Sequence, residues 1–91
     1  MKLTLDSVVV RSGEPCFSNI GEEVVLMSVN QGKYFNFDNI GAAIWNQIER
    51  PITIRDVCQN LTQSFKVSQD QCEKDVLNFL QLLLEKNLID A

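Results

Sequence analysis

Few of the side chains that most often take part in catalysis or metal binding occur in this chain, and those present do not form a catalytic set. There is no histidine, which removes the commonest general base and the commonest metal ligand. The three cysteines, Cys16, Cys58 and Cys72, lack the paired spacing of a zinc site, and their odd number does not suit a disulfide framework. Because no histidine can act as the base that forms a thiolate, we interpret them as free thiols packed as small hydrophobic residues in a reducing cytosol.

The carboxylates and glycines add no reactive group. Glu22 and Glu23 are adjacent, so in a strand they point to opposite faces and cannot cooperate as acid and base. Asp75 lies among apolar neighbours in a helical pattern, where the simplest interpretation is a solvated helix flank. Gly32 and Gly41 form no phosphate-binding pattern. We therefore expect a protein that is not an enzyme and that uses no cofactor and no metal.

The bulk composition predicts one folded domain over residues 1–91. Hydrophobic residues make up 45% and charged residues 22% of the sequence, as in ordinary globular proteins. The formal net charge is −4, and the eight basic residues are scattered rather than clustered, which argues against nucleic acid as a partner. The longest apolar runs, Val24–Met27 and Leu82–Leu84, are far too short to cross a membrane. The N-terminus does not resemble a signal peptide, so we expect a cytoplasmic protein.

The first third of the chain predicts a small antiparallel sheet. Val8–Val10 are β-branched and precede a turn, and Cys16–Ile20 could form a short continuation. Glu22–Val29 is the clearest strand. The segment Asn30–Gly32 contains residues that tolerate positive φ, so it predicts a hairpin that leads into a further strand, Lys33–Phe37.

Lys33–Phe37 is the most informative strand because it is aromatic and leads straight into a helix. Its period-two alternation places Phe35 and Phe37 on one face, which we expect to face the core, with Tyr34 and Asn36 on the other. Such a strand beside helices, without a catalytic set, predicts a surface that binds a peptide. An unpaired strand edge also favours self-association, so a weak dimer is an alternative form of the free protein.

After this strand the apolar period becomes helical. A first helix is predicted over Asn39–Glu49, Thr53 opens a second and Ser68 opens a third. Asn87 can supply the left-handed C-cap of the third helix. The apolar positions of this helix span an arc of about 220°, whereas an ordinary surface helix needs a stripe a little over about 100° wide. Either the helix packs on two sides, or its surplus face forms one wall of a groove beside the aromatic strand.

Taken in order, these segments resemble the PqqD-like proteins, the stand-alone form of the RiPP recognition element. The resemblance covers nearly the whole chain from about Leu5 onward and is carried by GKYFNFDNIGAAIW (32–45), TIRDVCQNL (53–61) and FKVSQDQCEKDVLNFLQLLLEKNLI (65–89). The segment around Ser68 and QCEKDVL (71–77) is most similar to the subgroup that serves lasso-peptide biosynthesis.

The resemblance implies an α+β fold that is winged-helix-like, with a three-stranded antiparallel sheet followed by three helices. It also implies a non-catalytic adaptor that holds the leader segment of a ribosomally made precursor peptide. In the family, this leader adds as a further strand in the groove between the third strand and the third helix. In the lasso subgroup the leader brings a Tyr, a Pro and a Leu, and the partners are a leader peptidase and a macrolactam cyclase.

Carried over to this sequence, the resemblance implies a peptide-binding site on two elements. Tyr34, Asn36 and the strand backbone are expected to meet the leader, and the third helix forms the opposing wall. The implied site residues are Lys33, Tyr34, Phe35, Asn36 and Phe37 of the strand and Asp75, Val76, Phe79, Leu82 and Leu83 of the helix.

Two alternatives remain open. The same module could serve another peptide-modifying enzyme, such as a radical-SAM maturase, and only the subgroup likeness separates the two. A winged-helix nucleic-acid binder has the same order of elements. The acidic balance and the scarcity of basic residues on the third helix, Lys74 and Lys86, argue against that class.

Overall fold

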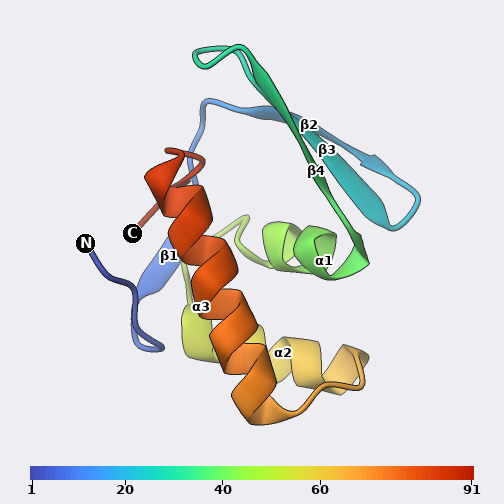
Figure 1. Ribbon diagram of the computed structural model, residues 1–91, viewed down its shortest axis with the longest axis vertical. Helices are drawn as coiled ribbons and strands as arrows, with labels where there is room; N and C mark the ends of the chain where they lie inside the picture. Colours follow the sequence, from blue (N-terminus) through green and yellow to red (C-terminus); the bar gives the residue numbers. More distant parts are fainter.

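Three helices and two small antiparallel sheets make up the computed structural model, which describes residues 1–91 (Figure 1). The elements in chain order are β1 (Val8–Arg11), β2 (Cys16–Ile20), β3 (Glu23–Ser28), β4 (Lys33–Phe37), α1 (Asn39–Gln47), β5 (Ile52–Thr53), α2 (Ile54–Ser64), α3 (Gln69–Glu85) and β6 (Ile89–Asp90). Strands β2, β3 and β4 form one antiparallel sheet in that order, and β1 lies between β5 and β6 in another. The fold is α+β, as predicted. No helix is long and apolar enough to span a bilayer.

The β2–β3–β4 sheet turns one face to the helices and leaves the other open. Val24 and Leu26 of β3 are fully buried, and they pair with Phe37 and Phe35 of β4. Phe37 is buried and Phe35 half-buried, whereas Tyr34 on the opposite face is 72% exposed. The alternation predicted for β4 is therefore confirmed, since the side chains of successive residues point to opposite faces.

Two helix N-termini form as their capping residues predict. The backbone N–H of Asp56 donates to the hydroxyl of Thr53 at 3.2 Å, and that of Gln71 donates to the hydroxyl of Ser68 at 3.2 Å. These bonds satisfy backbone donors that have no partner inside the helix. The side chain of Gln71 donates to Asp75 at 2.9 Å and makes no return bond to the backbone N–H of Ser68.

A second small sheet joins segments that are distant in sequence. β1 pairs with β5 through Val9 and Ile52, and with β6 through Arg11 and Ile89. The predicted strand at Val8–Val10, the three-stranded sheet and the three helices are all present. However, β1 does not join the sheet of β2, β3 and β4 as expected, because it pairs with β5 and β6, which were not predicted. Strands of two residues have no measurable period, and only their distant partner determines them. The first helix also ends at Gln47, two residues before its predicted end. The likeness to winged-helix domains stays a prediction.

α3 ends in a left-handed turn that brings the chain back toward β1. Asn87 has φ 60°, its N–H donates to the carbonyl of Leu84 at 3.0 Å, and the N–H of Leu88 donates to that of Leu83 at 3.0 Å. These two bonds are the Schellman pattern, and the contact that usually accompanies it is present as two buried leucines, Leu83 and Leu88. The predicted C-cap at Asn87 is confirmed.

The effect of substituting Asn87 on stability should therefore depend on how well the new residue tolerates a positive φ. Asn87→Ala is expected to lower the free energy of unfolding by about 1 kcal/mol, because a Cβ without a local hydrogen-bonding group is strained in the left-handed region. Asn87→Gly should leave the stability within a few tenths of a kcal/mol of the wild type. Urea denaturation measures both variants, and an equal loss for the two would contradict a role for backbone conformation.

Candidate functional site

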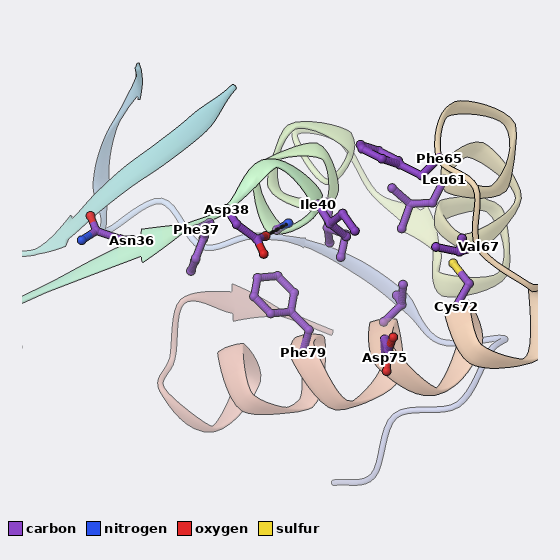
Figure 2. Close-up of a pocket in the computed structure, with 13 residues that line it drawn as sticks. Asn36, Phe37, Asp38, Ile40, Leu61, Phe65, Val67, Cys72, Asp75 and Phe79 are labelled. Atoms are coloured by element: carbon purple, nitrogen blue, oxygen red, sulfur yellow. Dashed lines mark hydrogen bonds between the residues drawn. The ribbon is translucent and has the colours of Figure 1, made fainter. Parts of the chain in front are cut away.

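An apolar hollow of about 500 Å³ opens between the end of β4, α1, the end of α2 and α3 (Figure 2). Nine of its 13 lining residues are hydrophobic. The lining residues are Asn36, Phe37, Asp38, Ile40, Gly41, Ile44, Leu61, Phe65, Val67, Cys72, Asp75, Val76 and Phe79. A concave apolar surface with a few polar groups at its margin is the usual form of a ligand site in a protein.

The junction of β4 and α1 forms one side of this hollow. Asp38 caps α1, since its carboxylate accepts a hydrogen bond from the N–H of Gly41 at 2.9 Å. A Cβ atom at Gly41 would lie 3.0 Å from the Cβ of Phe37 and 3.4 Å from the Cζ of Phe79. Glycine thus allows α1 to lie close to Phe37 and Phe79, whose rings meet edge to face with centroids 5.2 Å apart.

β4 is an edge strand whose outer edge has no partner. It pairs with β3 from Val24↔Phe37 to Ser28↔Lys33, and no other strand lies beside it. Because the backbone groups of an antiparallel strand point alternately to its two sides, every second residue of β4 leaves its N–H and C=O unpaired. Such an edge can accept a further strand through main-chain hydrogen bonds.

The opposite end of β4 is tied to the end of α3. The side-chain amide of Gln31 in the hairpin turn donates to the carbonyl oxygen of Lys86. The ammonium of Lys86 lies 5.8 Å from the centre of the Phe35 ring, within the range of a cation–π contact. Glu14 supports the turn from the other side, since it accepts hydrogen bonds from Ser28 and Val29. β4 is therefore fixed at both ends, and its outer edge stays open.

The structure brings half of the sequence-predicted site residues to the hollow. Asn36, Phe37, Asp75, Val76 and Phe79 line it, although Val76 is only 1% exposed.

The remaining predicted residues lie elsewhere on the same two elements. Lys33 and Tyr34 are exposed on β4, and Phe35 is half-buried beside Lys86. Leu82 is 49% exposed on α3 but does not line the hollow, whereas Leu83 is 2% exposed and belongs to the core. Contact of any of the ten residues with a peptide stays a prediction.

Several lining residues were missed by the sequence interpretation. Ile40, Gly41 and Ile44 come from α1, and Leu61 and Phe65 come from the end of α2. Their apolar spacing indicates a buried helix face, and nothing in that spacing separates the floor of an open hollow from a closed core. One usable signal is that Phe65 and Val67 are apolar although they follow Ser64, the last residue of α2.

The chemistry available in the hollow is binding rather than catalysis. Its cysteine, Cys72, is 4% exposed, and its thiol donates to the carbonyl of Cys58 at 3.9 Å. Burial raises the pKa of the Cys72 thiol and raises the pKa of Cys58 to about 12. Neither thiol is thus a thiolate at neutral pH. No three cysteine, aspartate or glutamate side chains lie close enough to hold a metal ion.

Comparison with known proteins identifies relatives of the whole fold. Residues 23–89 match the family model described as coenzyme PQQ synthesis protein D (PqqD). No curated protein matches the sequence. The solved structure of TbiB1 in complex with the TbiA(beta) leader peptide is similar, with a TM-score of 0.83 and 27% identity over 90% of this chain and 95% of that chain. A lasso peptide synthetase B1 complexed with its leader peptide has a TM-score of 0.79 and 20% identity over 91% and 98% of the two chains, which shows a shared fold.

The three thiols should differ sharply in reactivity. At pH 8 iodoacetamide is expected to modify only the exposed Cys16 in the folded protein and all three cysteines in urea, with Cys16→Ser as the control that removes the fast reaction. Rapid modification of Cys72 in the folded protein would contradict its burial.

The stability of the protein should also depend on the proton of Cys58. Because the folded-state pKa of Cys58 lies above that of an unfolded thiol, about 8.5, the stability linked to its proton is complete below pH 8.5 and is lost as the pH rises toward 12.

Proposed function

Since the chain belongs to the PqqD family, as a PqqD-like RiPP recognition element of the lasso-peptide type, we propose that it binds the leader segment of a ribosomally made precursor peptide. The observation that carries this proposal is the unpaired outer edge of β4 next to the apolar hollow. The edge offers main-chain hydrogen bonds, and the hollow offers space for apolar side chains. Together they meet the two requirements of strand addition.

Only every second residue of the bound leader would contact the site through its side chain. In an added strand successive side chains point to opposite faces, so every second leader residue would point toward the helices and the others toward solvent. The inward residues would meet Phe37 and Phe79 at the hollow, and Phe35 at the other end of β4. Aromatic and aliphatic leader residues suit these contacts, because apolar surface buried there is removed from water.

The proposed role is that of an adaptor without catalysis. The two similar solved structures are complexes with leader peptides, and the hollow of this chain contains no reactive thiolate. We propose that the chain presents its bound leader to a leader peptidase and, in the following step, to a macrolactam cyclase. A rigid adaptor increases the local concentration of a precursor at the enzyme that processes it.

A fluorescence-polarisation titration tests this function directly. A labelled lasso-type leader with the expected Tyr, Pro and Leu should bind saturably with a dissociation constant of about 10 μM or lower, and replacement of its Tyr or Leu by Ala should abolish binding. An unrelated peptide and a short DNA duplex serve as controls. No binding of several such leaders at about 100 μM, or about −5.5 kcal/mol, would contradict leader recognition.

A pair of substitutions tests the strand-addition geometry. Asn36→Pro removes the backbone donor of an edge-strand residue, so leader affinity should fall about tenfold or more. Asn36→Ala keeps that donor and should bind within about threefold of the wild type. Thermal unfolding establishes that both variants fold, and hydrogen exchange of the wild type should show leader-dependent protection at every second amide of β4. Equal affinity of the two folded variants, with no new protection, would refute strand pairing.

A further inference from the structure

The two ends of the β4 edge carry opposite charge. At the end where β4 enters α1, the three polar side chains that line the hollow are Asn36, Asp38 and Asp75, and no lysine or arginine lines it. At the end where the hairpin turns, Lys33 is exposed and Lys86 lies over Phe35. The groove that the proposed function assigns to a peptide is therefore electrostatically polar along its length.

The two carboxylates at the hollow retain free acceptor capacity. Asp38 accepts from the N–H of Gly41 at 2.9 Å, and Asp75 accepts from the side chain of Gln71 at 2.9 Å, in each case through one oxygen. The second oxygen of each accepts no hydrogen bond from the protein, and neither aspartate forms an ion pair. Figure 2 shows Asp38 next to the ring of Phe79 and Asp75 farther along α3. Each carboxylate therefore has one oxygen free to accept a hydrogen bond from a basic side chain of a ligand.

Nearby charges do not cancel either end. Lys74, the neighbour of Asp75 in sequence, lines a separate hollow on another side of α3 together with Lys2. Glu14 lies at the hairpin end, where its oxygens accept from Ser28 and Val29, and it forms no ion pair with Lys33 or Lys86. The five residues of β4 cover about 14 Å, which exceeds the Debye length of about 8 Å at physiological ionic strength. Each end therefore acts on the ligand largely by itself.

A strand edge alone leaves the register of an added peptide open. A shift of two residues restores the same pattern of hydrogen bonds and keeps the same side chains on each face. Side-chain contacts must therefore select the register. Resting on the proposed function, we propose that the cognate leader carries a Lys or Arg over Asp38 and Asp75, and an acidic residue four or five positions away, over Lys33 and Lys86. This charge pattern fixes the direction and register of the added strand, and Asp75 is its specificity-determining residue.

Selection from a random library tests the pattern without knowledge of the leader. A displayed library of random 12-residue peptides is selected on the folded wild-type chain and, in parallel, on Asp75→Asn. The wild type should enrich peptides in which a basic residue stands at fixed spacing from apolar residues and from an acidic one, and Asp75→Asn should lose the preference for the basic residue. Enrichment without that basic residue, or an identical pattern on the variant, would overturn the inference and leave peptide binding intact. Absence of any enriched peptide would overturn leader binding and the inference with it.

A charge exchange on one enriched peptide separates pairing from general electrostatics. Replacing its basic residue by Glu should weaken binding to the wild type about five- to tenfold, and Asp75→Lys should restore binding of the Glu peptide. Asp70→Asn is the matched control for Asp75→Asn, because it makes the same charge change on the same helix away from the hollow and should alter affinity less than twofold. The difference between the two peptides should shrink in 0.5 M salt. An equal effect of Asp70→Asn and Asp75→Asn would contradict a local pairing.

Discussion

The packing of Trp45 in α1 against residues of both sheets is the interaction on which the rest of the molecule depends. Its side chain is fully buried, its ring lies 5.8 Å from that of Phe17 in β2 and 5.9 Å from that of Phe37 in β4, and the guanidinium of Arg11 in β1 lies 5.1 Å from it. Arg11 also donates to the carbonyl of Trp45 at 3.0 Å. Both sheets therefore meet at one residue. The indole N–H has no acceptor within the protein, so the contribution of this side chain comes from the packing of its ring.

A chain of aromatic rings connects this contact in the core to the apolar hollow. Phe37 touches Trp45 on one side and Phe79 of α3 on the other, so the wall of the hollow is continuous with the core. β4 is held at that end by α1 and at the other by the bond from Gln31 to Lys86. A peptide that pairs with such a fixed edge does not have to order it first, and this lowers the entropic cost of association.

The sequence predicts the parts of this structure that local physics determines. The alternation of β4, the serine and threonine caps and the left-handed turn at Asn87 each depend on a few neighbouring residues, and each is observed. β5 and β6 depend on a distant partner and were not foreseen. In the site, the broad apolar arc of α3 indicates either a helix packed on two sides or one with a wall of a groove, but it does not identify which apolar side chains remain accessible to a ligand. Leu83 accordingly lies in the core, and Phe79 lies at the hollow.

The pairing of β1 with β6 has a consequence for how the chain reaches its native state. Arg11 lies opposite Ile89, so one of the two sheets joins the first elements of the chain to the last. Contacts of such high sequence separation slow folding, because a long loop must close before they contribute any stability. During synthesis the sheet cannot form until residues 89–90 have left the ribosome. The β2–β3–β4 sheet depends only on pairings between neighbouring segments, so it can form before α3 has been synthesised.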